Sequence, residues 1–146
     1  MQRTELPPQR PGAPPGGRET LLLVEDDEDV RDFLLFLLSR LGYRVLQATD
    51  GVQALELART FAEPIDLVLS DIVMPRMNGI ELAQRLGETR PGLKVLLMSG
   101  YPGDAAEVAL APGRLLKKPF ERDQLARCVR EVLDGRPATE AQRSPD

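Results

Sequence analysis

The chain alternates short apolar runs with longer amphipathic segments over most of its length. Five apolar runs have the length of strands: 20–24, 44–48, 65–70, 94–98 and 114–117. Five segments carry apolar residues three or four positions apart, which is the spacing of a helix that buries one face: 30–41, 51–61, 80–88, 104–110 and 121–133. Strands that alternate with helices predict an α/β fold whose parallel strands are covered on both faces.

The first and fourth predicted helices are delimited in different ways. The helix at 30–41 carries an apolar stripe and is followed by Gly42, a residue type that commonly ends helices. The segment at 104–110 lies between Pro102-Gly103 and Pro112-Gly113, which leaves room for about two turns. We therefore expect the fourth helix to be short and mobile.

The two ends of the chain differ in composition from the part between them. Residues 1–18 contain five prolines and three glycines with few apolar side chains, so they cannot offset the entropy cost of ordering. Residues 135–146 are similarly polar. These shifts predict one folded domain at 19–134 between a flexible lead and a flexible tail.

Charge and apolar run length narrow the class of protein. The 146 residues include 23 acidic and 19 basic side chains, a net charge of −4, so no basic surface for a nucleic-acid backbone is expected. No apolar run approaches the ~20 residues that span a bilayer, and the N-terminus lacks the apolar core of a signal peptide. We therefore expect a cytoplasmic protein that binds neither nucleic acid nor membrane directly.

The supply of reactive side chains is limited. The sequence has no histidine, which removes the commonest general base and the commonest metal ligand. The single cysteine, Cys128, lies at helical spacing from Leu125, Val129 and Val132, so we interpret it as a small core residue rather than a reactive thiol. Any chemistry must therefore use carboxylates, hydroxyls and lysines.

Acidic residues follow two of the predicted strands. Asp71 comes directly after the run at 65–70 and opens a loop rich in turn residues, so the chain displays this carboxylate rather than burying it in a strand. Glu25, Asp26 and Asp27 follow the first run; taken alone, acids at a helix start are ordinary, because the helix dipole favours them. The carboxyl ends of parallel strands meet at one edge of a sheet, so these acids should converge.

Other polar residues follow the fourth and fifth runs. Ser99 and Gly100 come after the fourth run, and Lys118 and Pro119 come after the fifth. Either pair alone would be an ordinary loop, but the same rule places both beside the acids. The expected site therefore combines several carboxylates with one hydroxyl and one ammonium group.

Such a site requires a further cation. Three carboxylates about 5 Å apart repel one another by roughly 3 kcal/mol per pair at an effective dielectric of about 20. Ligands that are all oxygen favour a hard divalent ion, so we predict Mg²⁺, with Mn²⁺ as the alternative. A metal ion beside Asp71, a hydroxyl and a lysine is suited to receiving a phosphoryl group on a carboxylate oxygen.

Four motifs in order resemble the receiver domain of two-component response regulators. They are Leu23-Val24-Glu25-Asp26-Asp27, Leu69-Ser70-Asp71-Ile72-Val73-Met74-Pro75 with Asn78-Gly79, Met98-Ser99-Gly100-Tyr101 and Lys117-Lys118-Pro119-Phe120. The resemblance covers about residues 20–133. It implies a doubly wound, flavodoxin-like (βα)5 fold with a five-stranded parallel sheet in the order 2-1-3-4-5, and a cis peptide bond between Lys118 and Pro119.

The resemblance also implies a phosphoacceptor and a metal site. Asp71 would accept the phosphoryl group and would bind the metal ion with Asp26, while Glu25 would bind it directly or through water and Val73 would supply a backbone carbonyl. Asp27 is the acid less expected to bind the metal ion, because the family uses the two acids that immediately follow the strand.

Three further roles follow from the resemblance. Ser99 would be the switch hydroxyl and Lys118 the phosphate-binding lysine, with Lys117 as a solvated neighbour. Receivers often carry an aromatic switch residue three positions before the lysine, and here that position is Leu115. Tyr101 is the alternative aromatic residue to cover the site.

We therefore expect a signalling phosphoacceptor rather than an enzyme for external substrates. By the resemblance, a histidine kinase or a histidine phosphotransfer protein supplies the phosphoryl group, and an unidentified downstream protein binds to the first, fourth or fifth helix or the fifth strand. The Met-Ser-Gly-Tyr motif and the proline-rich lead are similar to receivers of hybrid sensor histidine kinases, while Met1 equally fits a stand-alone regulator.

Two other functions stay open at this point. One is a docking module that resembles a receiver but never carries phosphate. The other is a Mg²⁺-dependent phosphatase that uses Asp71 as a transient nucleophile; such enzymes usually carry a second acid two residues later, where this chain has Val73.

Overall fold

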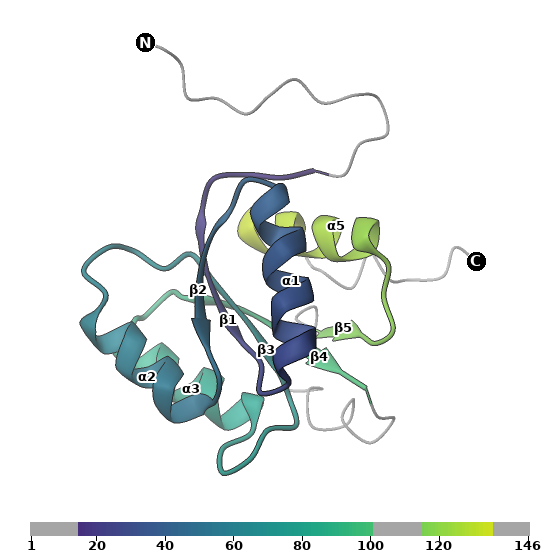
Figure 1. Ribbon diagram of the computed structural model, residues 1–146. Helices are drawn as coiled ribbons and strands as arrows, with labels where there is room; N and C mark the ends of the chain where they lie inside the picture. Colours follow the sequence, from purple (N-terminus) through teal and green to yellow (C-terminus); the bar gives the residue numbers. More distant parts are fainter. Residues whose placement is uncertain (1–14, 101–114, 136–146) are drawn as a thin grey trace.

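Five parallel strands form one sheet in the order β2-β1-β3-β4-β5 (Figure 1). The strands are β1 (Thr20–Val24), β2 (Arg44–Ala48), β3 (Leu67–Asp71), β4 (Lys94–Ser99) and β5 (Leu115–Lys117). The computed structural model describes residues 15–100 and 115–135, so the helix predicted at 104–110 lies outside the described residues. The fold class and the strand order expected from the resemblance are confirmed.

Helices cover both faces of this sheet. They are α1 (Glu28–Arg40), α2 (Gly51–Thr60), α3 (Gly79–Thr89) and α5 (Arg122–Leu133). Figure 1 shows α1 and α5 on one side of the sheet and α2 and α3 on the other. Each pair of helices therefore closes its own apolar core against the strands.

The central strand β1 contributes to both cores because its side chains alternate between the two faces. Leu21 and Leu23 pack in the core beneath α1 and α5, whereas Leu22 and Val24 pack in the core beneath α2 and α3. All four side chains have no exposed surface. Full burial of each contributes about 1.5–3 kcal/mol, which explains the unbroken apolar run that predicted this strand.

The edge strand β2 is covered on both faces as predicted, with Val45 packed against one core and Leu46 against the other, but it is less buried than the central strands. Arg44 and Gln47 are exposed there, and of this strand only Ala48 is buried. Local sequence reports apolar content but not the position of a strand in the sheet, so it could not distinguish this edge from the centre.

The first helix begins two residues earlier than its apolar stripe predicts. Asp27 is the N-cap, and its Oδ1 accepts a hydrogen bond from the backbone N–H of Val30 at 3.1 Å. Glu28 and Asp29 therefore lie in the first turn, where the helix dipole favours acidic side chains. Asp27, the acid less expected to bind the metal ion, therefore has a structural role as the cap of this helix.

Two further observations concern the single cysteine and the length of the helices. Cys128 is fully buried in the core beneath α5, and burial raises the pKa of its thiol to about 11, so the interpretation as a core residue is confirmed. Among the residues that the structure describes, no helix combines the length and apolar character needed to cross a membrane.

Candidate functional site

The carboxyl ends of the strands bring the predicted polar residues to one edge of the sheet. In the strand register, Val24 pairs with Ser70, so Glu25 and Asp71 each follow a paired residue on adjacent strands. Asp71 is the last residue of β3 rather than the first residue after it, since it still pairs with Met98 of β4. The structure thus brings together acids that are 46 positions apart in sequence.

Lys118 forms the central ion pair of the site. Its Nζ lies 3.0 Å from the carboxylate of Asp71 and 3.8 Å from Oε1 of Glu25. The lysine backbone N–H donates to the carbonyl of Ser99 at 2.7 Å, and the peptide bond that follows, to Pro119, is cis as expected. The lysine side chain is 28% exposed and that of Asp71 14%, so this pair faces a partly open space.

Three carboxylates gather around this lysine. Glu25, Asp26 and Asp71 each place one carboxylate oxygen within 4.8 Å of the others. At that separation, carboxylates repel by roughly 3 kcal/mol per pair at an effective dielectric of about 20. One ammonium group cannot neutralise three such charges, so the cluster retains an excess of negative charge.

Glu25 is the residue most affected by this excess of negative charge. Its side chain is only 2% exposed, and its Oε2 accepts from the backbone N–H of Asp27 at 3.1 Å, while its buried Oε1 has no hydrogen-bond partner. Burial, and after it the charge of Asp71, raise the pKa of Glu25 to about 7, against the lowering effects of the Asp27 N–H and of Lys118. The ionised form therefore needs additional positive charge.

These residues fit a hard divalent cation. The donors are carboxylate oxygens, one of them buried without a hydrogen-bond partner, and the described part of the cluster offers neither nitrogen nor sulfur ligands. Asp26 contributes an exposed carboxylate, which suits an open site. Val73 lies two residues after Asp71 with its side chain 53% exposed, so whether its carbonyl binds metal stays a prediction.

Gly79 holds the loop after Asp71 close to the strand. A Cβ atom at this position would lie 2.3 Å from the backbone carbonyl oxygen of Asp71, a distance that no side chain tolerates. The Gly79 N–H donates to the carbonyl of Ile72 at 2.7 Å, and the Asn78 side chain caps α3 through the N–H of Glu81. The Asn-Gly pair therefore folds the loop back at once.

Ser99, at the end of β4, and Lys118, directly after β5, lie at this same edge, while Tyr101 is not placed. Ser99 is the last residue of β4, is 5% exposed and pairs in register with Lys117 of β5. Lys117 itself is exposed, as expected for a solvated neighbour. Tyr101 lies outside the described residues.

Sequence reasoning missed Arg31. Its guanidinium Nη1 donates to the backbone carbonyl of Glu25 at 2.9 Å and so ties the end of β1 to the first turns of α1. The only local signal is a basic residue one helical turn after the N-cap Asp27, which is too common to indicate such a contact.

Comparison with known proteins shows which family this chain belongs to. The sequence profile described as "Response regulator receiver domain" matches residues 21–130 of this chain. The chain belongs to the response regulator receiver family. This receiver is 41% identical over 120 residues to the response regulator receiver protein CpdR of Brucella abortus, a match that covers 77% of this chain and 95% of CpdR.

A second relative is part of a much larger protein. The receiver is 41% identical over 121 residues to the sensor kinase CckA of Brucella abortus, covering 81% of this chain but only 13% of the kinase. A crystal structure of the receiver domain of the hybrid histidine kinase CckA superposes with a TM-score of 0.66 at 34% identity, covering 78% of this chain and 98% of that domain. Relatives therefore occur both as stand-alone receivers and within kinases.

Proposed function

We propose that Asp71 accepts a phosphoryl group from a phosphohistidine of a histidine kinase or a histidine phosphotransfer protein. The observation that carries this proposal is the position of the Lys118 ammonium, 3.0 Å from the Asp71 carboxylate, with oxygens of Glu25 and Asp26 within 4.8 Å. Family membership supports the same chemistry, because it makes a signalling phosphoacceptor the coarse function of this chain.

In the proposed transfer, one carboxylate oxygen of Asp71 attacks the phosphorus atom. The new O–P bond forms as the P–N bond to the donor imidazole breaks, and the nitrogen leaves with the bonding electron pair. Lys118 holds its positive charge beside the phosphoryl oxygens, which carry negative charge throughout the transfer. Ser99, at the end of the neighbouring strand, is proposed to donate a hydrogen bond to the phosphoryl group once it has arrived.

Glu25, Asp26 and Asp71, with the Val73 carbonyl, are the residues that would hold Mg²⁺ or Mn²⁺. When bound, such an ion neutralises negative charge on the transferring group. The buried Oε1 of Glu25 supports this donor set, since it accepts no hydrogen bond and its nearest cation, Lys118 at 3.8 Å, is shared with Asp71.

Phosphorylation is proposed to bias binding of a downstream partner. A dianionic phosphoryl group on Asp71 would compete with Glu25 and Asp71 for Lys118, so the contacts at this sheet edge change. Leu115 occupies the position of the family's aromatic switch, so we propose that this receiver transmits the change without that aromatic residue.

Phosphate uptake tests the function directly. The full chain is incubated with acetyl phosphate and Mg²⁺ and weighed by mass spectrometry, with Asp71→Asn and Asp66→Asn alongside. Asp66 is a suitable control because its carboxylate instead accepts from the backbone N–H of Thr20 at 2.8 Å. We expect one phosphoryl group on the wild type and on Asp66→Asn, and none on Asp71→Asn.

Other outcomes would identify one of the two alternative functions or reject Asp71 as the acceptor. No gain of mass, together with no Mg²⁺ binding by calorimetry, would identify a docking module that carries no phosphate. Multiple turnovers on small phosphorylated substrates would identify a phosphatase. Uptake that persists in Asp71→Asn would reject the proposed acceptor.

A further inference from the structure

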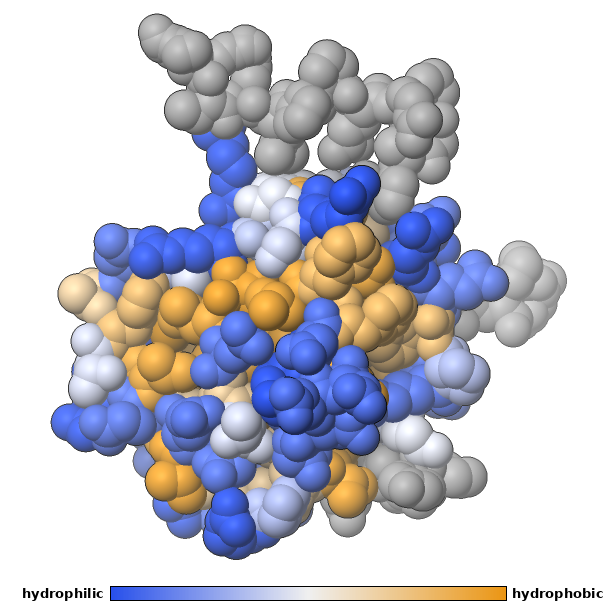
Figure 2. All heavy atoms as spheres, in the orientation of Figure 1, coloured by the Kyte–Doolittle hydropathy of each residue, from blue (hydrophilic) through white to orange (hydrophobic). Residues whose placement is uncertain are grey.

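Helix α1 exposes a stripe of four residues to solvent. Phe33 and Phe36 are 54% and 57% exposed, although phenylalanine is among the residue types most often buried. Asp29 precedes them and Arg40 follows them, and both are exposed as well. At 3.6 residues per turn, the four side chains leave the helix within about 60° of one another. Figure 2 shows apolar side chains gathered on the face where α1 and β2 lie.

The order of this α1 stripe is self-complementary. Phe33 and Phe36 lie at equal distances from its midpoint, and so do Asp29 and Arg40. When two copies of α1 meet antiparallel, about a two-fold axis through that midpoint, Phe33 of one copy lies opposite Phe36 of the other. In the same arrangement Asp29 lies opposite Arg40. The pairing that brings the rings together therefore also matches opposite charges, and each contact occurs twice.

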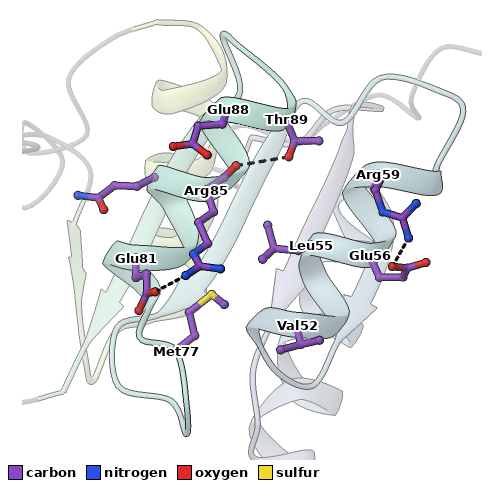
Figure 3. Close-up of a pocket in the computed structure, with 10 residues that line it drawn as sticks. Val52, Leu55, Glu56, Arg59, Met77, Glu81, Arg85, Glu88 and Thr89 are labelled. Atoms are coloured by element: carbon purple, nitrogen blue, oxygen red, sulfur yellow. Dashed lines mark hydrogen bonds and ion pairs between the residues drawn. The ribbon is translucent and has the colours of Figure 1, made fainter.

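The two charges of the stripe cannot pair with each other within one chain. Asp29 and Arg40 are eleven residues apart, which is about 16 Å along the helix. Neither forms an ion pair among the residues that the structure describes, and the Arg40 guanidinium lies instead 5.6 Å from the centre of the Phe36 ring. In the hollow between α2 and α3, by contrast, Glu81 pairs with Arg85 on its own helix at 2.9 Å (Figure 3). The charges of the α1 stripe are thus left to pair with a second molecule.

We propose that this chain self-associates through α1 as a two-fold dimer, in which antiparallel helices pack Phe33 against Phe36 and pair Asp29 with Arg40. Burial of the exposed rings drives the association. The charges set its direction, because a parallel arrangement would place like charges opposite each other. The contact area is small, so the expected dissociation constant is about 0.1–1 mM.

Sedimentation equilibrium of the full chain measures the association, from about 10 µM to about 1 mM and without Mg²⁺ or a phosphodonor. The wild type should approach the mass of a dimer as its concentration rises. Phe33→Ser and Phe36→Ser should each weaken association about tenfold, because apolar surface that the dimer buries is lost. Val52→Ser is the control, since Val52 is 59% exposed on α2, and should leave the affinity within about twofold of the wild type.

Two charge reversals test the antiparallel arrangement. Asp29→Arg and Arg40→Asp each place like charges opposite one another at both ends of the contact, so each variant alone should associate about tenfold more weakly. An equimolar mixture of the two variants restores opposite charges at both ends. The mixture should therefore associate with an affinity within about threefold of the wild type, and circular dichroism checks that each variant stays helical.

Contrary outcomes overturn the proposal in different ways. A wild type that stays monomeric at about 1 mM excludes the second copy and leaves the α1 stripe to a different protein. Association that persists in both phenylalanine variants, or that Val52→Ser abolishes, places the contact elsewhere on the molecule. A mixture that associates no better than its separate variants rejects the antiparallel arrangement. None of these results depends on whether Asp71 accepts phosphate.

Discussion

At the scale of single residues, Gly79 shows how backbone packing shapes the site. Its missing Cβ allows the start of α3 to approach the carbonyl oxygen of Asp71, where an added carbon would lie at 2.3 Å. Asp71 itself is held by the sheet register, so the loop after it has little freedom to move away. A methyl group at this position must therefore displace backbone rather than a flexible side chain.

We expect Gly79→Ala to lower the free energy of unfolding by about 2–3 kcal/mol, because the added carbon overpacks a rigid contact. Gly87→Ala is a matched control in the same helix, since a Cβ there meets nothing within 4 Å. It should raise the free energy of unfolding by about 0.5–1 kcal/mol through helix propensity. Urea titration followed by circular dichroism measures both; equal effects would show that the close approach is absent.

Asp27 separates a structural acid from the acids of the site. Its carboxylate caps α1, so Asp27→Ala should lower the free energy of unfolding by about 1 kcal/mol. Its backbone N–H, which donates to Glu25, is retained in this variant. We expect the Mg²⁺ affinity measured by calorimetry to stay within about twofold, whereas Asp26→Asn should lose most of it. A matching loss in Asp27→Ala would place this third acid in the metal site.

At the scale of elements, one arginine joins the ends of two helices. Arg90, the C-cap of α3, donates to the backbone carbonyls of Ala58, Phe61 and Glu63, at 2.9, 2.5 and 3.0 Å. These carbonyls belong to the end of α2 and the turn after it, where helix geometry leaves acceptors unsatisfied. Arg90 therefore fixes α2 and α3 to each other.

We expect Arg90→Met to lower the free energy of unfolding by about 2 kcal/mol, because methionine keeps apolar contacts but donates no hydrogen bonds. Arg59→Met is the control, since Arg59 is 66% exposed and, among the residues that the structure describes, pairs with the similarly exposed Glu56. That exposed pair should contribute at most about 0.5 kcal/mol. Chemical denaturation of both variants measures the difference, and similar losses would refute the bridging role.

At the scale of the whole molecule, the segment before β1 is bound to the ends of two distant helices. Arg130 of α5 donates to the carbonyl of Gly16 at 2.9 Å and forms an ion pair with the carboxylate of Glu19 at 2.5 Å. Gly17 donates to the carbonyl of Leu41 at 3.1 Å, just after α1. The contacts begin within the lead predicted at 1–18, whose flexibility stays a prediction for the remaining residues.

The ion pair predicts a dependence of stability on pH. The hydrogen bond from Arg130 holds the pKa of Glu19 below its ordinary value of 4.5. The folded state therefore binds this proton less readily than the unfolded state, so the stabilisation is complete above pH 4.5 and is lost as the pH falls through the lower folded-state value. We expect Glu19→Gln to cost about 1–2 kcal/mol at pH 7 and progressively less below pH 4.5.

Thermal or urea unfolding of the wild type and Glu19→Gln from neutral to acidic pH measures this difference. Glu63→Gln is the control, because Glu63 and its partner Arg44 are 61% and 55% exposed. Its effect should be small at every pH. A difference for Glu19→Gln that does not change with pH would mean that the ion pair contributes nothing.

The sequence alone predicted the strands and helices that the structure describes and the polar residues that meet at the candidate site. The run at 20–24 predicted the bounds of β1 without error, because burial on both faces favours consecutive apolar side chains such as those of residues 21–24. Turn residues predicted the loop that follows Asp71, although Asp71 itself still belongs to β3, and the strand-end rule placed Glu25 and Lys118 beside it. These are consequences of local pattern and of a general property of parallel sheets.

Only the tertiary structure decided which long side chains join distant segments and which strand edge stays exposed. Arg31, Arg90 and Arg130 each reach a backbone carbonyl outside their own helix, and nothing in their local sequence distinguishes them from solvated arginines. The exposed positions of β2 likewise follow from its place at the edge. Local periodicity records which face of an element is buried, whereas such contacts depend on where the whole chain brings its acceptors.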